Sequence, residues 1–350
     1  MLYNSKNPHG GDIYGGGIAL DFSENTNPFG TPEGVKEAIR RSAELARRYP
    51  DPYCRSLTKK LAECEGISER AILFGAGAAE LIYSFAEAEK PKTALIPAPT
   101  FSEYALALER FGTEIIRFGL KESEDFALTE AFAEAILSQR PEAVFVCDPN
   151  NPTGRAAEPG VMEGILEACR KTGARLFLDE CFLDFTQGRG GMKERIPDHK
   201  ELVILRAFTK SFGMAGVRLG YVLSSDEELL YAMSRTVQPW NVSSTAQAAG
   251  EAALGERDFI LKAAEYVKEE RGKLGAELER LGMRVFPSDA NFLLFKGPIG
   301  LDRELLKRGV AIRSCANYEG LSCGFYRTAV KLRDENETLA AAIRDAVKEL

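Results

Sequence analysis

A single lysine stands where a buried apolar run gives way to a polar turn. Lys210 follows the run Leu202–Leu205 and belongs to the segment RAFTKSFGMAGVRLGY (206–221). Desolvation at a strand end disfavours the ammonium form of a lysine, which lowers its pKa and leaves a nucleophilic amine. The segment therefore predicts an amine that reacts with an aldehyde. A solvated loop lysine is the simpler interpretation, and this segment alone leaves both open.

Two neighbouring features offer sites for an anion. Arg218 lies eight residues after Lys210, among glycines that let other backbone approach closely. A second turn, Gly75-Ala76-Gly77, follows the apolar run Ala71–Phe74 and precedes a helical pattern. The first N–H groups of a helix are free and the helix dipole favours negative charge, so this turn predicts a phosphate site. It matches neither GxGxxG nor a Walker A loop, and by itself it is a weak signal.

Two polar residues complete the set. Asp179 follows the apolar run Arg175–Leu178, and a buried carboxylate there needs a cationic partner. Asn151 lies in DPNNPTG (148–154), directly after another apolar run. Alone, Asp179 is equally consistent with a helix cap or an internal salt bridge, and Asn151 with turn chemistry. Together, amine, carboxylate, amide and anion sites match the requirements of pyridoxal 5'-phosphate, whose aldehyde, ring nitrogen and phosphate each need a partner.

The elements that must position these residues alternate along the chain. Strand-like apolar runs and helical patterns follow one another from Leu57 to Leu205, which predicts βα units and a mostly parallel sheet covered on both faces. Ligands bind beyond the carboxyl ends of such strands, where the polar turns lie. After Trp240 a long helix and short strands indicate an α+β unit. We expect an arm at 1–30 that joins the small domain and the active site, a large domain at 31–255 and a small domain at 256–350. The apolar patch at 18–22 is assigned to the arm, outside the core.

Composition narrows the function classes. A chain of 350 residues with 45% hydrophobic and 28% charged residues is typical of a globular protein with about two domains. A net charge of −7 without basic blocks argues against nucleic acid and anionic membranes as partners. The N-terminal residues lack the apolar segment of a signal peptide. Seven scattered cysteines without CxxC pairs, beside two histidines, predict neither a metal site nor a disulfide framework. We expect a cytoplasmic protein.

Five motifs in order carry a family resemblance across nearly the whole chain. They are GAGAAE, PAPTF, DPNNPTG, LDE and TKSFGMAGVRLGY. Their order resembles that of the fold-type I aminotransferases, and DPNNPTG in combination with the lysine–arginine motif TKSFGMAGVRLGY is highly specific. The resemblance implies the aspartate aminotransferase-like α/β fold, with a mostly parallel central sheet in a large domain plus a small α+β domain. It also implies pyridoxal 5'-phosphate as the cofactor.

The resemblance assigns roles to individual residues. Lys210 would bond to the cofactor aldehyde, Asp179 would pair with the pyridine nitrogen, and Asn151 would contact the 3'-oxygen. The remaining cofactor contacts would come from Phe101 stacking on the ring and from a phosphate-binding group made of Gly75, Ala76, Gly77, Thr209 and Arg218. Tyr49 would reach in from a neighbouring subunit, which implies a homodimer with shared active sites. Ala207 departs from the pattern, because relatives usually carry a residue at this position whose hydroxyl contacts the cofactor phosphate.

Other positions resemble one branch of the family, which holds histidinol-phosphate aminotransferase and threonine-phosphate decarboxylase. Phe182 stands where transaminases usually carry a tyrosine, and HGG (9–11) and LDFSENTNPFG (20–30) resemble decarboxylase segments. The substrate-binding residues implied are His9, Gly10, Asn25, Asn151, Arg313 and Arg327.

Two late arginines suit a substrate with two anionic groups, because each guanidinium offers a bidentate fork. The resemblance to the decarboxylase segments implies decarboxylation of O-phospho-L-threonine, with O-phospho-L-serine as a second substrate, and the two arginines are consistent with it. The product would be (R)-1-amino-2-propanol O-2-phosphate, the aminopropanol linker of cobalamin. Two alternatives stay open: a histidinol-phosphate or other phospho-substrate aminotransferase, and a non-catalytic sensor that binds pyridoxal 5'-phosphate.

Overall fold

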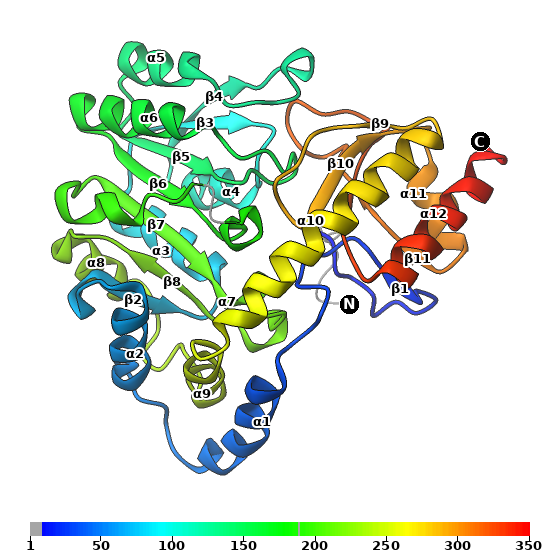
Figure 1. Ribbon diagram of the computed structural model, residues 1–350. Helices are drawn as coiled ribbons and strands as arrows, with labels where there is room; N and C mark the ends of the chain where they lie inside the picture. The colour runs from blue at the N-terminus through cyan, green and yellow to red at the C-terminus, as the bar shows by residue number, and fades with distance from the viewer. Residues whose placement is uncertain (1–8, 188–189) are drawn as a thin grey trace.

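The apolar runs of the first two thirds of the chain pair into one sheet. The computed structural model describes residues 9–187 and 190–350, and over these residues the largest sheet has seven strands in the order β2-β8-β7-β6-β5-β3-β4 (Figure 1). All neighbouring pairs are parallel except those of β8, which is antiparallel to β2 and β7. The strands are β2 (Ile72–Gly75), β3 (Thr93–Ala98), β4 (Glu114–Gly119), β5 (Ala143–Cys147), β6 (Arg175–Asp179), β7 (Leu202–Ala207) and β8 (Gly220–Leu223).

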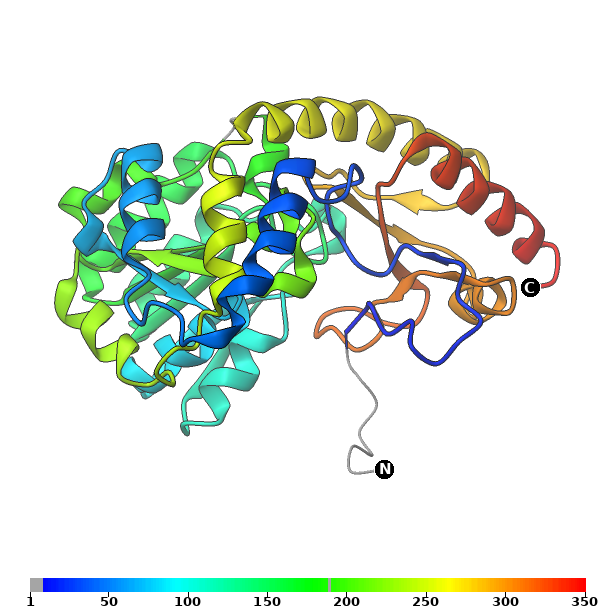
Figure 2. The same ribbon diagram turned by 90° about the horizontal axis from the view of Figure 1, so that it is seen from below.

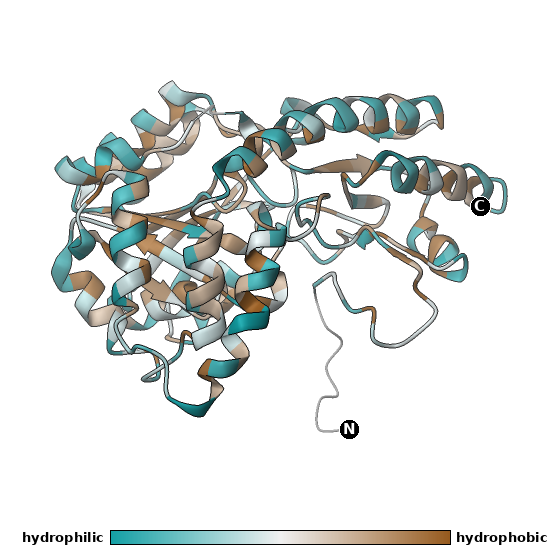
Figure 3. Ribbon diagram, turned by 60° about the horizontal axis from the view of Figure 1, so that its bottom comes forward, coloured by the Kyte–Doolittle hydropathy of each residue, from teal (hydrophilic) through white to brown (hydrophobic). Residues whose placement is uncertain are grey.

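Alternate side chains of the central strands enter two separate cores. Val144 and Val146 of β5 belong to a cluster with α2, α6 and α9, whereas Phe145 and Cys147 belong to one with α3, α4 and α8. This is the period-2 alternation of a sheet buried on both faces, and Figure 3 shows apolar strands between helices with polar outer sides. The helices of this part are α1 (Glu33–Ser42), α2 (Arg55–Glu65), α3 (Ala78–Glu89), α4 (Glu103–Glu109), α5 (Glu130–Gln139), α6 (Pro159–Thr172), α7 (Phe208–Ser211), α8 (Glu227–Ser234) and α9 (Ser244–Ala253).

The last third of the chain forms a smaller α+β unit. A four-stranded antiparallel sheet in the order β12-β13-β10-β9 packs against two helices, and the long helix α10 crosses from the large sheet to this unit (Figure 1). The elements are α10 (Arg257–Arg280), β9 (Arg284–Val285), β10 (Phe292–Lys296), α11 (Leu301–Lys307), β11 (Val310–Ala311), β12 (Arg313–Ser314), β13 (Phe325–Ala329) and α12 (Arg333–Val347).

The N-terminal segment is more deeply integrated than its composition predicts. Strand β1 (Leu20–Asp21) pairs in parallel with β11, and the Phe22 side chain is fully buried in the core of the small unit. The assignment of residues 18–22 to an arm outside the core is therefore wrong, because the apolar patch supplies a strand to a sheet formed much later in the chain. Figure 2 shows this segment running along the small unit before it enters α1.

The loop that follows β1 reaches the lysine turn. Asn27 is 3% exposed, its amide nitrogen donates to the Ser211 carbonyl at 2.7 Å, and its backbone N–H donates to the Lys210 carbonyl at 3.0 Å. The short helix α7 is thus fixed at its carboxyl end by residues from the start of the chain. Within the described part of the chain, no helix is long and apolar enough to span a bilayer.

Candidate active site

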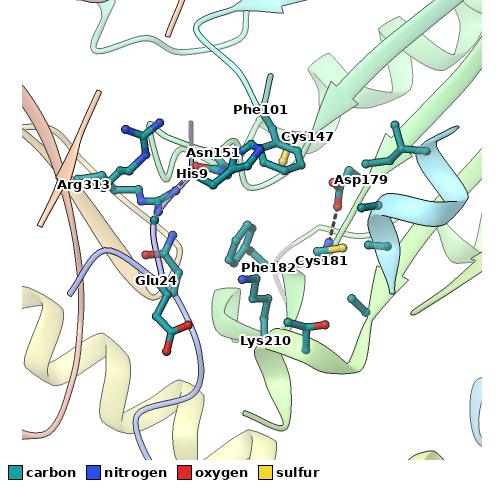
Figure 4. A pocket seen from close by; sticks show the side chains of 18 of the residues that line it. His9, Glu24, Phe101, Cys147, Asn151, Asp179, Cys181, Phe182, Lys210 and Arg313 are labelled. Carbon is teal, nitrogen blue, oxygen red and sulfur yellow. Dashed lines mark hydrogen bonds between the residues drawn. The ribbon is translucent and has the colours of Figure 1, made fainter. Parts of the chain in front are cut away.

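A cavity lies where the carboxyl ends of the large sheet meet the small unit (Figure 4). Parallel strands end at one edge, and β8, being antiparallel, begins at that edge. This orientation explains how Arg218, two residues before β8, joins residues that follow β5, β6 and β7. Most predicted site residues line this cavity, namely His9, Gly10, Asn25, Phe101, Asn151, Asp179, Thr209, Lys210, Arg218, Arg313 and Arg327.

Lys210 points into the cavity from α7. Burial lowers the pKa of its amine to about 8, and the Arg327 guanidinium contributes in the same direction. Among the described residues, its Nζ has no hydrogen bond or ion pair with a side chain, and it lies 5.8 Å from the centre of the Phe182 ring. An amine that is partly neutral at physiological pH and has no anionic partner is suited to nucleophilic attack on an aldehyde.

Asp179 ends strand β6 with its carboxylate beside the cavity. Its Oδ2 accepts a hydrogen bond from the Tyr104 hydroxyl at 2.6 Å, and its Oδ1 accepts one from the Cys181 N–H at 2.9 Å. Burial raises the pKa of this carboxyl, and these hydrogen bonds act against that shift. Donors therefore favour the charged form, and over residues 9–187 and 190–350 it makes no ion pair, which suits a carboxylate that pairs with a protonated ring nitrogen.

The glycines before α3 serve a different purpose from the one predicted. A Cβ at Gly77 would lie 2.5 Å from the Arg218 Nη2, and the backbone has φ +89°, so a larger residue would be strained and would displace this guanidinium. The Ala76 N–H donates to the Glu80 carboxylate at 2.6 Å, and the Gly77 N–H donates to the Gly75 carbonyl. None of the three turn residues lines the cavity. The assignment of their amides to phosphate binding therefore needs correction.

The first helical residues, Ala78 and Ala79, line the cavity in their place. Their N–H groups belong to the first turn of a twelve-residue helix, where backbone donors have no intrahelical acceptor. Arg218 and Thr209 line the same cavity. Groups that could bind an anion thus lie one or two residues beyond the predicted turn.

These residues fit pyridoxal 5'-phosphate. The buried Lys210 amine, the Asp179 carboxylate and the cradle that Gly77 leaves around Arg218 provide partners for an aldehyde, a ring nitrogen and a phosphate. Phe101 borders the cavity and contacts Tyr104 edge to face, with ring centres 5.6 Å apart. An aromatic ring in this place can cover one face of a flat cofactor.

Two arginines occupy the side of the cavity made by the small unit. Arg313 and Arg327 are directly opposite each other on β12 and β13, which places both side chains on the same face of the sheet. Arg327 is 6% exposed and donates to the Asn151 Oδ1 at 2.5 Å and to the Ser23 carbonyl at 2.7 Å. Arg313 donates to Asn317 at 2.7 Å and lies over the Tyr318 ring.

The arm and the loop after β1 close the cavity from a third side. With its amide oxygen turned toward Arg327, Asn25 accepts from the guanidinium at 3.2 and 3.3 Å. His9 lies beside Phe101, with ring centres 5.6 Å apart (Figure 4). Residues distant in sequence therefore surround one space with cationic and amide groups.

One predicted residue lies elsewhere on this chain. The Tyr49 side chain is 76% exposed and stacks on Trp240, with ring centres 4.6 Å apart, and it does not line the cavity. Its contact with the site of a neighbouring subunit stays a prediction.

Sequence reasoning missed several cavity residues: Ser23, Glu24, Tyr104, Cys147, Cys181 and Tyr318. Position in the sequence could have found two of them, because Cys181 follows Asp179 by two residues and Tyr104 follows Phe101 by one helical turn. Tyr318 carries no local signal.

The geometry of fold and site defines a family of enzymes that use pyridoxal 5'-phosphate. The profile of the family Aminotransferase class I and II matches residues 18–343, so the chain belongs to this family. The predicted fold and cofactor are thereby confirmed.

Individual relatives divide between two activities. The chain is 37% identical to the threonine-phosphate decarboxylase of Salmonella typhimurium, over 99% of this chain and 98% of the relative. It is 32% identical to histidinol-phosphate aminotransferase 1 of Archaeoglobus fulgidus, over 94% and 99% of the two chains. The crystal structure of the histidinol-phosphate aminotransferase from Clostridium acetobutylicum superimposes with a TM-score of 0.87 at 27% identity, covering 95% of this chain and all of that one.

Proposed function

We propose that this protein decarboxylates O-phospho-L-threonine to (R)-1-amino-2-propanol O-2-phosphate, the aminopropanol linker of cobalamin. The observation that carries the proposal is the cross-strand pair Arg313 and Arg327, two guanidinium groups on one wall of a cavity that also contains Lys210. A substrate with a phosphate and a carboxylate needs two such anion sites. Similarity to the Salmonella typhimurium decarboxylase along nearly the whole chain supports the same substrate.

Pyridoxal 5'-phosphate supplies an aldehyde for the substrate amine and an electron-withdrawing ring that stabilises negative charge at Cα. The Asp179 carboxylate, oriented by Tyr104 and the Cys181 N–H, would keep the ring nitrogen protonated. Arg218, Thr209 and the first amides of α3 would bind the phosphate of the cofactor. Each of these groups is fixed by a strand end or a helix start, so little reorganisation accompanies binding.

The arginines orient the substrate for loss of CO2. The two guanidinium groups would hold the substrate carboxylate in the one orientation from which CO2 leaves, while the bound cofactor would stabilise the charge left at Cα. Arg327, held by Asn151 and Ser23, provides a rigid fork, and Arg313 provides a second anion partner across the sheet. The amine of Lys210, with a pKa of about 8, is largely protonated at pH 7 and can deliver a proton from Nζ to Cα after CO2 has left.

An aminotransferase acting on histidinol phosphate is the second candidate, supported by the 32% identity to the Archaeoglobus fulgidus enzyme. Phe182 argues against it, because transaminases of this resemblance usually carry a tyrosine there. The Phe182 side chain is 5% exposed and packs edge to face on Phe292, so it contributes no hydroxyl to the cavity.

One incubation separates the candidates. The protein loaded with pyridoxal 5'-phosphate is mixed with O-phospho-L-threonine, and CO2 release is compared with amino-group transfer to 2-oxoglutarate; histidinol phosphate is tested in parallel. We expect CO2 from phosphothreonine and a weaker reaction with O-phospho-L-serine, since one methyl group contributes about 1–3 kcal/mol of discrimination. Amino transfer without CO2 would overturn the decarboxylase, and absence of both reactions would favour a sensor.

We also propose a homodimer whose sites are shared through Tyr49. Mixed dimers of Lys210→Ala and Tyr49→Ala subunits test this arrangement. If Tyr49 serves the partner, one of the two sites in each mixed dimer keeps both residues, and about half of the wild-type activity returns. If Tyr49 serves its own subunit, neither site is intact and the activity does not return.

A further inference from the structure

A carboxylate lies behind the mouth of the cavity without lining it. Glu103 begins helix α4, two residues after Phe101, and its side chain is 14% exposed. Its Oε1 is 2.7 Å from the His9 Nε2, and its Oε2 accepts a hydrogen bond from the Tyr83 hydroxyl at 2.9 Å. Both oxygens are therefore engaged, one by the arm and one by helix α3.

The adjoining residues of the arm are held from the opposite direction. The Gly11 N–H donates to the Ser23 Oγ at 2.8 Å, and a Cβ at Gly10 would lie 2.3 Å from the Ser23 carbonyl oxygen. That same carbonyl accepts the hydrogen bond from Arg327. Residues 9–11 thus connect α4 of the large domain to the loop that carries the substrate-side residues, and Glu103 is the anchor at one end.

We propose that Glu103 is a positioning residue that acts through His9 and strengthens binding of the anionic substrate. This inference rests on the proposed function, which places His9 and Arg327 around a phosphorylated substrate. The carboxylate fixes the imidazole beside Phe101 through the contact between its Oε1 and the His9 Nε2. The hydrogen bond with His9 in turn lowers the pKa of Glu103, so the carboxylate stays ionised.

The proposal predicts a change in substrate affinity that is opposite in direction to the change predicted by simple electrostatics. A negative charge near a site for a doubly anionic substrate repels that substrate, so its removal alone should tighten binding. If Glu103 acts through His9, removal should weaken binding, because the imidazole loses its fixed position. The direction of the change in substrate binding therefore distinguishes a positioning residue from one that affects the site only through its charge.

The test uses the enzyme loaded with its cofactor and the variant Glu103→Gln, which keeps the size of the side chain. Glu109→Gln is the matched control, since Glu109 is an exposed carboxylate at the other end of the same helix. We expect the KM for O-phospho-L-threonine to rise about tenfold in Glu103→Gln, the typical weight of a charge-assisted hydrogen bond. In the control variant Glu109→Gln, neither kcat nor KM should change. Unchanged or tighter binding in Glu103→Gln would overturn the proposal.

A double-mutant cycle with His9→Ala shows whether Glu103 acts through His9. In the His9→Ala background we expect Glu103→Gln no longer to raise KM, because only the direct electrostatic effect of the carboxylate remains; an equal rise of KM in both backgrounds would refute the inference. Hydrogen exchange of the peptide that contains Gly11 gives a readout without turnover, and exchange should accelerate in Glu103→Gln. Failure of the wild type to release CO2 would reject the decarboxylase, whereas unchanged exchange would reject the role of Glu103 under either activity.

Discussion

The two halves of the cavity are built in different ways. Asn151, Asp179 and Lys210 follow three consecutive neighbouring strands of one sheet, whose ladder fixes their spacing. The substrate half is assembled from the arm, the loop after β1 and strands β12 and β13, which no single sheet connects. Its geometry depends on hydrogen bonds between segments, above all those of Arg327. In the proposed reaction, the rigid half would therefore carry the chemistry and the assembled half would determine the choice of substrate.

The largest effect should come from the rigid half. Lys210→Ala removes the amine nucleophile, and we expect turnover to fall by about 10⁴-fold or more, as for other covalent nucleophiles. The visible absorbance that reports a covalent bond between lysine and cofactor should disappear. Lys262→Ala, an exposed lysine on α10, serves as the control and should keep full activity. Appreciable turnover in Lys210→Ala would remove this residue from the reaction.

Arg327→Ala should damage the assembled half while leaving the cofactor in place. Truncation of a buried charged partner costs about 2–5 kcal/mol, so the KM for the substrate should rise roughly a hundredfold or more. Arg313→Ala should have a smaller effect, because Arg313 is only partly buried. Titration of each apoprotein with pyridoxal 5'-phosphate checks the distinction. If Arg327→Ala weakened cofactor binding as much as it weakened substrate binding, the two halves would not be separable at Arg327.

The same contrast explains what could be predicted from the sequence. The turns after β5, β6 and β7 were recognisable because apolar runs precede them, and parallel strands end at a common edge. The role of Gly77 was misassigned, since a sequence does not show that Arg218 lies 2.5 Å from where its Cβ would be. Strand β1 was missed because two residues carry no periodic signal and pair with β11 far along the chain.

Contacts between distant segments account for most of the remaining gaps. The resemblance to the family named His9, Asn25, Arg313 and Arg327, but spacing alone gave no reason to group them. Tyr318 reaches Asn151 with its hydroxyl at 3.4 Å only after the small unit has packed on the large sheet. Such contacts depend on tertiary packing, which local patterns do not encode.

Tyr104→Phe should produce a moderate effect confined to the cofactor. The variant removes the 2.6 Å hydrogen bond to the Asp179 carboxylate, a bond that opposes the rise in pKa caused by burial. We expect about tenfold weaker binding of pyridoxal 5'-phosphate, with a larger loss at low pH as Asp179 becomes protonated more readily. Tyr326→Phe, which removes a buried hydroxyl bonded to the Pro298 carbonyl, is the control. Equal affinities in the two variants would contradict the role of Tyr104.

The smallest predicted effect measures how strongly the halves interact. Since only the neutral amine attacks an aldehyde, attachment of the cofactor to the apoprotein should accelerate as pH rises through the Lys210 pKa of about 8, well below the usual range for lysine. The Arg327 guanidinium lowers this pKa and the Glu24 carboxylate raises it. Arg327→Met should therefore move the midpoint upward and Glu24→Gln downward, whereas the exposed Lys262→Ala should leave it unchanged. Both side chains come from the substrate half. If neither variant moved the midpoint of the pH dependence, this half would not influence the pKa of the Lys210 amine. An upward shift in Arg327→Met together with a downward shift in Glu24→Gln would show that the assembled half sets the reactivity of the Lys210 amine in the rigid half.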